Sequence, residues 1–271
     1  VFWVVSREAV DSAITAGGTD VVAQRVDVPV EATHFLADFD DDAGLVLHVA
    51  HSPATDLSEW VRPYDENAYD RQRAPRVDGY LAVGPMDVGR LGRYVVDGAT
   101  GKVTDAKVLA DDLLTWSVAL YAARDVGTEA QPPAKLETLF WSTEGAYPEL
   151  LTQFVRDLYA DYPHRITPLA EIDAMGTEGG RKSAILRVDT TRMVIEDSVV
   201  LEDGTMPSSL QIVGKPGTTD PLDAWLLATM FTPEGAQLWI WDARSLSKPV
   251  CKLELPEPSF GFSLHCAWLP S

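Results

Sequence analysis

The chain has 271 residues, with 41 acidic and 22 basic side chains and a formal net charge of −19 at pH 7. Hydrophobic residues make up 46% and charged residues 23%, which is typical of a globular protein and too apolar for a disordered one. The negative charge repels phosphate backbones and no basic patch offsets it, so nucleic acid is excluded as a partner. No apolar run approaches the roughly 18 residues that a membrane-spanning helix needs.

The chain opens on an apolar, strand-like run from Val1 to Val5, without Met, a basic leader or a signal-type cleavage site. This start predicts a processed or truncated chain. The two cysteines, Cys251 and Cys266, are too few for a disulfide framework and indicate a reducing compartment. We therefore expect a cytoplasmic protein, and the sequence leaves peripheral contact with a membrane open.

Short apolar segments separated by Gly, Pro and Asp predict an all-β protein with few helices. A first hairpin is expected from residues 31–39 and 45–51, joined by a turn over residues 40–44. Apolar residues at helical spacing predict one helix over residues 150–162, between Pro148 and Pro163, and a shorter one over residues 7–14. Residues 63–78, 127–134 and 173–182 have the composition of linkers. No shift in composition marks a domain boundary, so one domain is expected.

Three later hairpins resemble one another, over residues 94–109, 186–201 and 240–255. In each, a strand ends at an aspartate (Asp97, Asp189 or Asp242), and the last Leu of the second strand follows 12 or 13 residues later. A recurrent hairpin is typical of repeat architectures, and with four-stranded units it indicates a β-propeller. Three unrelated hairpins in a β-sandwich are the alternative.

Several common sites are excluded by their motifs. The sequence has no Gly-rich phosphate loop, HExxH, GxSxG or CxxC. Asp38, Asp40 and Asp42 resemble the start of a calcium loop. Ala43 and Val49, however, stand where that loop requires Gly and Glu, so a solvated turn is expected there.

The five histidines differ in their surroundings. His34 lies in an apolar strand and His265 lies among aromatic residues, where a lone histidine is usually a hydrogen-bonded core residue. His48 and His51 are three apart on one strand, face opposite sides and cannot share a metal. His164, beside Pro163 and Arg165, is expected at the surface.

The C-terminal segment over residues 248–270, with Phe262, His265 and Trp268, resembles the closing segment of the carotenoid cleavage oxygenases. This family includes the retinoid isomerase of the eye and bacterial stilbene-cleaving dioxygenases. Residues 34–40 resemble its upstream His-x-x-Asn-Ala-x-Glu segment, and residues 91–97 its Arg-Tyr strand. The sequence departs from the family in having Asp40 in place of Glu, and in the two residues inserted between Phe262 and His265.

The resemblance implies a seven-bladed β-propeller, of which this chain would form about four blades, with a helical cap over an apolar tunnel. It implies a non-haem Fe(II) dioxygenase that cleaves a conjugated C=C bond of a carotenoid, apocarotenoid or stilbene-like substrate with O2. Four histidines hold the iron in the family, and carboxylates accept the far N–H of some of them. The implied residues are His34 and His265 for the metal; Asp40, Glu144 and Glu149 for the carboxylates; and Phe35, Phe262 and Trp268 for the substrate.

Two of the family's ligands precede the His34 segment, but none of the 33 residues before His34 is a histidine. Residues 1–271 are therefore expected to be the C-terminal portion of a single propeller domain, inactive alone. Two alternatives stay open. Trp241–Asp242 is compatible with a propeller that only binds proteins, although the Gly-His partner motif is missing. The many acids are compatible with a lactonase that uses a carboxylate-bound ion, although the chain has a single Asn, Asn67.

Overall fold

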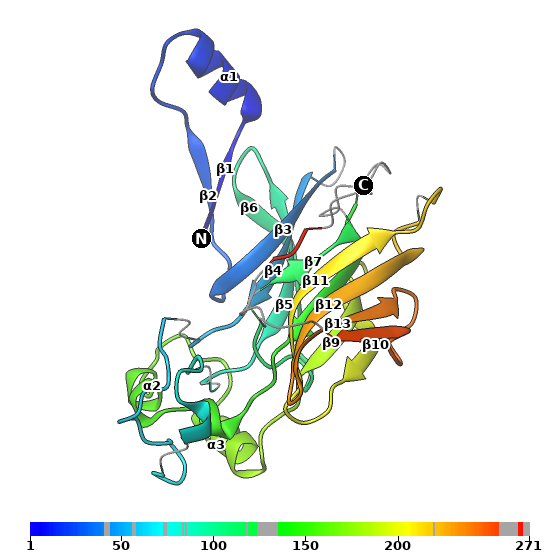
Figure 1. Ribbon diagram of the computed structural model, residues 1–271. Helices are drawn as coiled ribbons and strands as arrows, with labels where there is room; N and C mark the ends of the chain where they lie inside the picture. Colours follow the sequence, from blue (N-terminus) through cyan, green and yellow to red (C-terminus); the bar gives the residue numbers. More distant parts are fainter. Residues whose placement is uncertain are drawn as a thin grey trace.

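The computed structural model describes residues 1–40, 44–55, 58–72, 75–82, 84, 86–117, 119–123, 135–218, 220–254 and 265–267. These residues form four antiparallel sheets and a few short helices (Figure 1). The predicted all-β class is confirmed. None of the helices in these ranges combines the length and the apolar character that a membrane crossing needs.

Three sheets have four strands each, which follow one another in chain order. The first sheet contains β3 (Ala32–Asp40), β4 (Gly44–His51), β5 (Arg90–Asp97) and β6 (Lys102–Leu109). The second contains β7 (Leu120–Tyr121), β8 (Thr138–Thr143), β9 (Ala184–Asp189) and β10 (Val194–Val200). The third contains β11 (Met206–Gly214), β12 (Ala224–Thr232), β13 (Gly235–Asp242) and β14 (Cys251–Glu254). The predicted first hairpin is β3–β4.

The repeated hairpins are the last two strands of each of these sheets: β5–β6, β9–β10 and β13–β14. The aspartate at the end of the first strand plays the same structural role in each hairpin. Asp97 Oδ1 accepts the amide of Ala99 at 2.9 Å, while Asp189 and Asp242 accept amides of their own turns at 2.8 and 2.9 Å. A short carboxylate that caps the turn behind a strand explains why the residue recurs.

Apolar clusters and hydrogen bonds join the sheets in sequence. Trp141 of β8 is fully buried in a cluster with residues of the first sheet, and Trp241 of β13 in one with residues of the second. Arg187 of β9 donates to the carbonyl of Ala243 at 3.0 Å, across the second and third sheets. Burying such large side chains contributes roughly 1.5–3 kcal/mol each. The three sheets follow one another in series, which differs from the two facing sheets of a β-sandwich. The described residues form three four-stranded sheets, whereas about four blades were expected.

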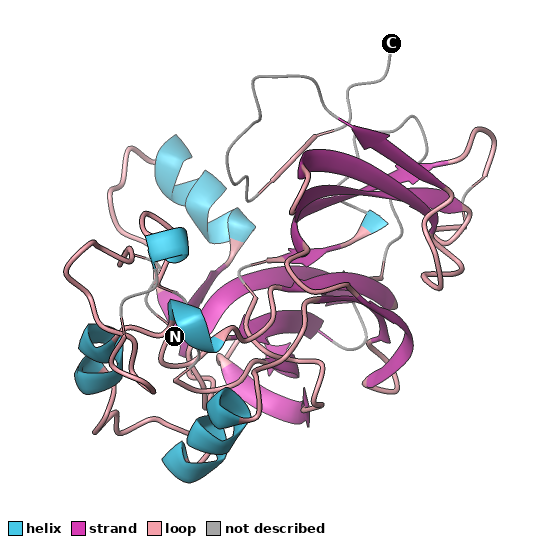
Figure 2. Ribbon diagram, turned by 60° about the horizontal axis from the view of Figure 1, so that its bottom comes forward, coloured by secondary structure: helices cyan, strands magenta, loops and turns pink. Residues whose placement is uncertain are grey.

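Helices and long connections gather outside the strands (Figure 2). The β4–β5 connection carries η1 (Pro75–Val77), and the β8–β9 connection carries η3 (Pro148–Leu150), α2 (Gln153–Leu158) and α3 (Leu169–Thr177). The two connections pack together in one apolar cluster, where Gly84 lies so close to Leu151 that a side chain could not fit between them. Figure 1 shows α2 and α3 at the opposite end of the molecule from α1.

Two sequence predictions are corrected in this region. The helix expected over residues 150–162 is only the six-residue α2, because Leu151 is extended and Thr152 caps the helix by accepting the amide of Val155 at 3.2 Å. Leu151 and Val155 are both buried, so the i, i+4 spacing arises without a continuous helix. The linker expected over residues 173–182 begins inside α3. The linker over residues 127–134 lies outside the described residues.

The N-terminal unit projects away from the sheets (Figure 1). It consists of β1 (Phe2–Val5), α1 (Arg7–Thr15) and β2 (Ala23–Val26), so the predicted short helix is confirmed. Ser6 caps α1 by accepting the amide of Ala9. Phe2 and Val4 pack against the first sheet, with the Phe2 ring 4.8 Å from that of Phe35.

His51, at the end of β4, is a fully buried histidine with both ring nitrogens occupied. Nδ1 lies 2.9 Å from the carbonyl oxygen of Glu31, and Nε2 lies 2.8 Å from the hydroxyl of Tyr94. A carbonyl only accepts, so Nδ1 carries the proton and Tyr94 donates to Nε2. Burial lowers the pKa of His51 below its ordinary value of 6.5.

Replacing His51 with Leu should lower the free energy of unfolding by about 2–4 kcal/mol at pH 7.5, because the buried Tyr94 hydroxyl and the Glu31 carbonyl lose their hydrogen bonds. The difference in free energy of unfolding between the variant and the unmodified protein should shrink as the pH falls below 6.5. Below this pH the unfolded state of the unmodified protein binds a proton at His51 before the folded state does, which lowers the stability of the unmodified protein. Urea denaturation between pH 5 and 7.5 measures both values. A difference in free energy of unfolding that stays constant between pH 5 and 7.5 would contradict the neutral, buried state of His51.

Candidate metal centre

The structure brings His34 and His265 together, although they lie near opposite ends of the chain. Their ring centroids are 5.4 Å apart and their planes meet at 41°. His34 lies near the start of β3, half-buried, and His265 belongs to the short described stretch over residues 265–267. Both residues were expected from the sequence to hold a metal.

The spacing of the two rings fits two ligands of one metal ion. With nitrogen–metal distances of about 2.1 Å and bond angles of roughly 90–110°, two imidazoles have centroids roughly 4.5–5.5 Å apart. Neutral imidazole is a good ligand for Fe(II) and for other divalent first-row metals. Among the described residues, no group of three or more His, Cys, Asp or Glu side chains is placed to hold a metal ion. The pair is therefore the candidate centre, and further ligands would have to come from elsewhere.

The backbone of the second sheet sets the protonation state of His34. The amide of Leu120, in β7, points at Nδ1 of His34 from 3.5 Å. In this geometry Nδ1 is an acceptor, so the proton of the neutral ring is on Nε2.

Tyr121 extends the pair into the interior. Its ring centroid lies 6.2 Å from that of His265, and its side chain is buried between the second and third sheets. Burial raises the pKa of Tyr121 well above its ordinary value. Tyr121 is therefore an uncharged phenol at neutral pH.

Glu144 is a buried carboxyl just after β8. Its backbone is fixed, since its amide donates to the Trp116 carbonyl at 3.1 Å and its carbonyl accepts from Ser183 Oγ at 2.8 Å. Neither carboxyl oxygen makes a hydrogen bond of normal geometry with a described residue. Burial raises the pKa of Glu144 well above its ordinary value, so the protein holds a proton there.

Glu149, the other glutamate expected beside a ligand, has different surroundings. It lies on η3, half-exposed, where it forms an ion pair with Arg76 at 3.1 Å. This pair lines an open hollow beside Asn67 and Tyr69, about 550 Å³ in volume. The buried Glu144 is therefore the better placed of the two carboxylates.

The geometry of β3 separates Asp40 from His34. The two residues are six positions apart on one continuous strand, which at about 3.3 Å per residue puts their Cα atoms roughly 20 Å apart. The role expected for Asp40, as acceptor of the far N–H of a ligand histidine, stays a prediction. The nearer acid, Asp38, is buried and accepts from His48 Nε2 at 3.0 Å and from the amide of Leu136 at 2.8 Å.

Of the three residues expected to contact the substrate, Phe35 is the one that lies among the described residues. Phe35 follows His34 on β3, so its side chain points to the opposite face of the strand, where it contacts Phe2 and is 48% exposed. Phe262 and Trp268 lie outside the described residues. The other histidines have partners of their own: His48 binds Asp38, His51 binds Glu31 and Tyr94, and His164 stacks on Tyr162 at 5.6 Å.

The sequence did not predict that Tyr121 lies beside the histidine pair, and no spacing or motif indicates it. It belongs to an ordinary apolar run, and only the contact between β7 and the C-terminal histidine gives it a place beside the pair.

Comparison with known proteins identifies the wider group. The model of the retinal pigment epithelial membrane protein family matches residues 1–270. Among solved structures, a mutant of Synechocystis apocarotenoid oxygenase is 16% identical, with a TM-score of 0.54. The cobalt-substituted form of that oxygenase is 14% identical, with a TM-score of 0.55, and Pseudomonas brassicacearum lignostilbene dioxygenase is 14% identical, with a TM-score of 0.52.

Each of these comparisons covers 94% of this chain, but only 42% of the two Synechocystis structures and 45% of the Pseudomonas dioxygenase. The chain thus spans less than half the length of these proteins. No curated protein matches the sequence. At 14–16% identity the solved structures establish the fold, which is the fold of carotenoid and stilbene oxygenases.

Replacing Glu144 with Gln should change the pH dependence of stability. A carboxyl whose pKa is raised in the folded state stabilises the protein at low pH, and this contribution is lost as the pH rises above the ordinary value of 4.5. Relative to the parent protein, Glu144→Gln should therefore gain about 1–2 kcal/mol between pH 5 and pH 8. Urea denaturation at both pH values measures this, with Glu149→Gln as the exposed control. If the free energy of unfolding changed equally between pH 5 and pH 8 in both variants, the raised pKa of Glu144 would be contradicted.

Proposed function

Because this chain belongs to the retinal pigment epithelial membrane protein family, the carotenoid oxygenases, we propose that it supplies part of a non-haem Fe(II) dioxygenase. The reaction is the scission of a conjugated C=C bond of a carotenoid, apocarotenoid or stilbene-like substrate by O2. The observation that carries the proposal is the His34–His265 pair, whose centroid separation of 5.4 Å suits two imidazoles on one metal ion.

Each residue of the cluster has a role in this proposal. His34 and His265 provide two neutral nitrogen ligands, which leave the charge of the ion undiminished. When bound, iron supplies the activation of O2, whose two atoms end in the two carbonyl products, so no external reductant is consumed. Glu144 would hold the far N–H of a ligand histidine, because a buried carboxyl with both oxygens available is suited to orient an imidazole.

The substrate would be apolar. Phe35, Phe262 and Trp268 are proposed to contact it, and the aromatic face of the exposed Phe35 is suited to stacking on a polyene or stilbene. The similar structures include an apocarotenoid oxygenase and a lignostilbene dioxygenase. These names support the substrate class and do not choose between a carotenoid and a stilbene.

The proposal includes the expectation that residues 1–271 alone are inactive. Two histidines supply half of the four ligands of the family, and the chain spans 42–45% of the similar structures. The complete enzyme would be a seven-bladed cytoplasmic propeller whose remaining blades carry the other two ligands. The family match and the histidine pair favour this function over a protein-binding propeller or a carboxylate-based lactonase.

Metal titration of the chain tests the proposed centre. Co(II) serves as a visible-absorbing probe, since a similar oxygenase was studied with cobalt. We expect weak Co(II) binding with nitrogen-ligand absorption, which His34→Ala and His265→Ala each abolish because one imidazole cannot hold the ion. His164→Ala is the matched control and should leave the spectrum unchanged.

Two results would overturn parts of the proposal separately. A cobalt spectrum that survives both His34→Ala and His265→Ala would exclude the histidine pair as the centre. Stoichiometric Fe(II) binding, with cleavage of an apocarotenal or a hydroxystilbene by the isolated 271 residues followed by HPLC, would contradict the incompleteness while keeping the function.

A further inference from the structure

The two-residue strand β7 borders both histidines of the candidate metal centre. The amide of Leu120 points at Nδ1 of His34 from 3.5 Å, and the ring of the next residue, Tyr121, lies 6.2 Å from the ring of His265. Both residues of β7 pair with residues of β8. Because this ladder fixes the backbone of β7, the two contacts start from a rigid element.

The Tyr121 side chain is anchored at its far end on the third sheet. It is 4% exposed and belongs to the apolar cluster between the second and third sheets. Its hydroxyl donates to the carbonyl of Ser208, in β11, at 3.4 Å. A close-packed tyrosine with an engaged hydroxyl has little rotamer freedom, so its ring is a fixed surface.

This fixed ring meets the ring of His265 in an edge-to-face arrangement. The two ring planes are inclined by 63°. Aromatic pairs of this kind attract each other because the positive edge of one ring lies against the negative face of the other. Since the phenolic oxygen is engaged with Ser208, Tyr121 acts on His265 through its ring and not as a further oxygen ligand.

His265 itself is exposed, unlike Tyr121. An exposed side chain samples several staggered rotamers unless contacts restrict it. A metal ion that needs two imidazoles at one separation binds more tightly when both are held there beforehand, since less side-chain freedom is lost on binding. A contact that restricts the His265 ring therefore strengthens the proposed centre.

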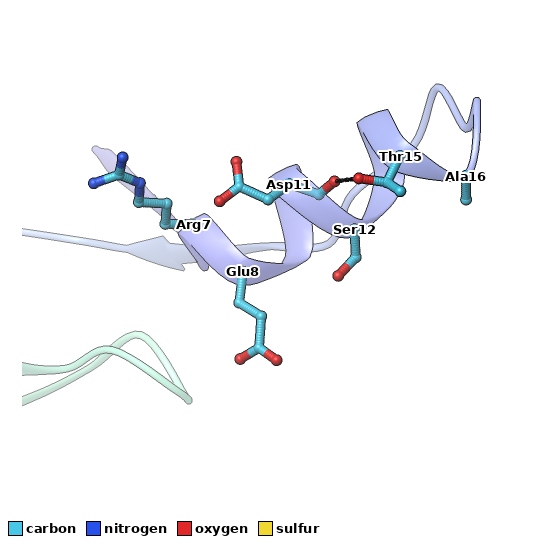
Figure 3. A pocket seen from close by; sticks show the side chains of 6 residues that line it. All are labelled: Arg7, Glu8, Asp11, Ser12, Thr15 and Ala16. Carbon is cyan, nitrogen blue, oxygen red and sulfur yellow. Dashed lines mark hydrogen bonds between the residues drawn. The ribbon is translucent and has the colours of Figure 1, made fainter.

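The hollow along α1, about 650 Å³ in volume, differs from this place (Figure 3). Its lining side chains, among them Arg7, Glu8 and Asp11, all belong to α1 or to Ala16 directly after it. Side chains that share one exposed helix face keep much of their rotamer freedom, whereas Tyr121 is held between two sheets.

We propose that Tyr121 is a positioning residue for His265. Its ring, tied to the third sheet, holds the imidazole in the orientation that lies 5.4 Å from His34. The inference rests on the proposed function, because it assigns a further residue to the same metal centre. The third sheet thereby contributes to the centre through the contact between Ser208 and Tyr121.

Nuclear magnetic resonance of the metal-free chain tests the contact itself. The ring protons of His265, identified by their loss in His265→Ala, lie beside an aromatic ring whose removal changes their chemical shifts. Tyr121→Leu should therefore move these resonances, whereas Tyr121→Phe keeps the ring and should leave them nearly unchanged. Tyr147→Leu, which removes a tyrosine whose hydroxyl lies 2.9 Å from Ser183 Oγ, is the matched control and should leave them in place.

A second measurement needs no substitution of Tyr121. In the unmodified chain, the ring protons of Tyr121 and His265 should show a nuclear Overhauser effect, because the two rings are in contact. Absence of this effect, or His265 resonances that stay unchanged in Tyr121→Leu, overturns the proposal.

Co(II) titration tests the consequence for the centre. Tyr121→Leu should raise the dissociation constant for Co(II) about two- to tenfold, the factor that corresponds to one edge-to-face aromatic pair. Tyr121→Phe should keep the affinity of the unmodified chain, because the ring remains and Ser142 Oγ still donates to the Ser208 carbonyl at 3.4 Å. Tyr147→Leu should also keep this affinity. An unchanged affinity in Tyr121→Leu, or an equal loss in Tyr121→Leu and Tyr121→Phe, overturns the proposal.

The measurements separate this inference from the proposed function. If the unmodified chain binds no Co(II), the metal centre is contradicted, and the resonances of His265 still decide whether Tyr121 holds its ring. Near-ultraviolet circular dichroism checks that the Tyr121 variants are folded. Variants that lower the free energy of unfolding but change neither the His265 resonances nor the Co(II) affinity would show an ordinary core residue, which also overturns the proposal.

Discussion

The contact between the inner strands of the first and second sheets controls where chemistry can occur in this protein. β3 and β7 belong to different sheets, and the bonds between the sheets are few and buried. Asp38 accepts from both His48 of its own sheet and the amide of Leu136 before β8, and the Leu120 amide points at His34. Because unmade hydrogen bonds in such an interior cost free energy, the two sheets are held in one relative position. That position brings Tyr121 and His265 to His34.

The neighbourhood of the pair is unusual in what it leaves unsatisfied. Buried polar groups are normally hydrogen-bonded, yet both carboxyl oxygens of Glu144 lack a partner of normal geometry among the described residues. Burial raises the pKa of Tyr121 and of Glu144 above their ordinary values. Tyr121 and Glu144 are buried, whereas His34 is half-buried and His265 is exposed.

Local patterns predicted most of the architecture. The three aspartate-ended hairpins and the helix of residues 7–15 depend on hydrogen bonds within a few residues, which the sequence displays directly. The helix expected over residues 150–162 was wrong for a related reason. Leu151 and Val155 face one apolar cluster from an extended segment and a short helix, and spacing alone does not distinguish this from a continuous helix.

The sequence alone determined the fold class, the repeated hairpin, the family resemblance and the two histidines that carry it. Only the tertiary structure decided that these histidines lie together, that Tyr121 lies beside His265, and that Glu144 is buried while Glu149 pairs with Arg76. The physical reason is the separation along the sequence between the residues that interact. Turns, caps and alternation are set by neighbours in the chain, whereas the site depends on how sheets stack across more than two hundred residues.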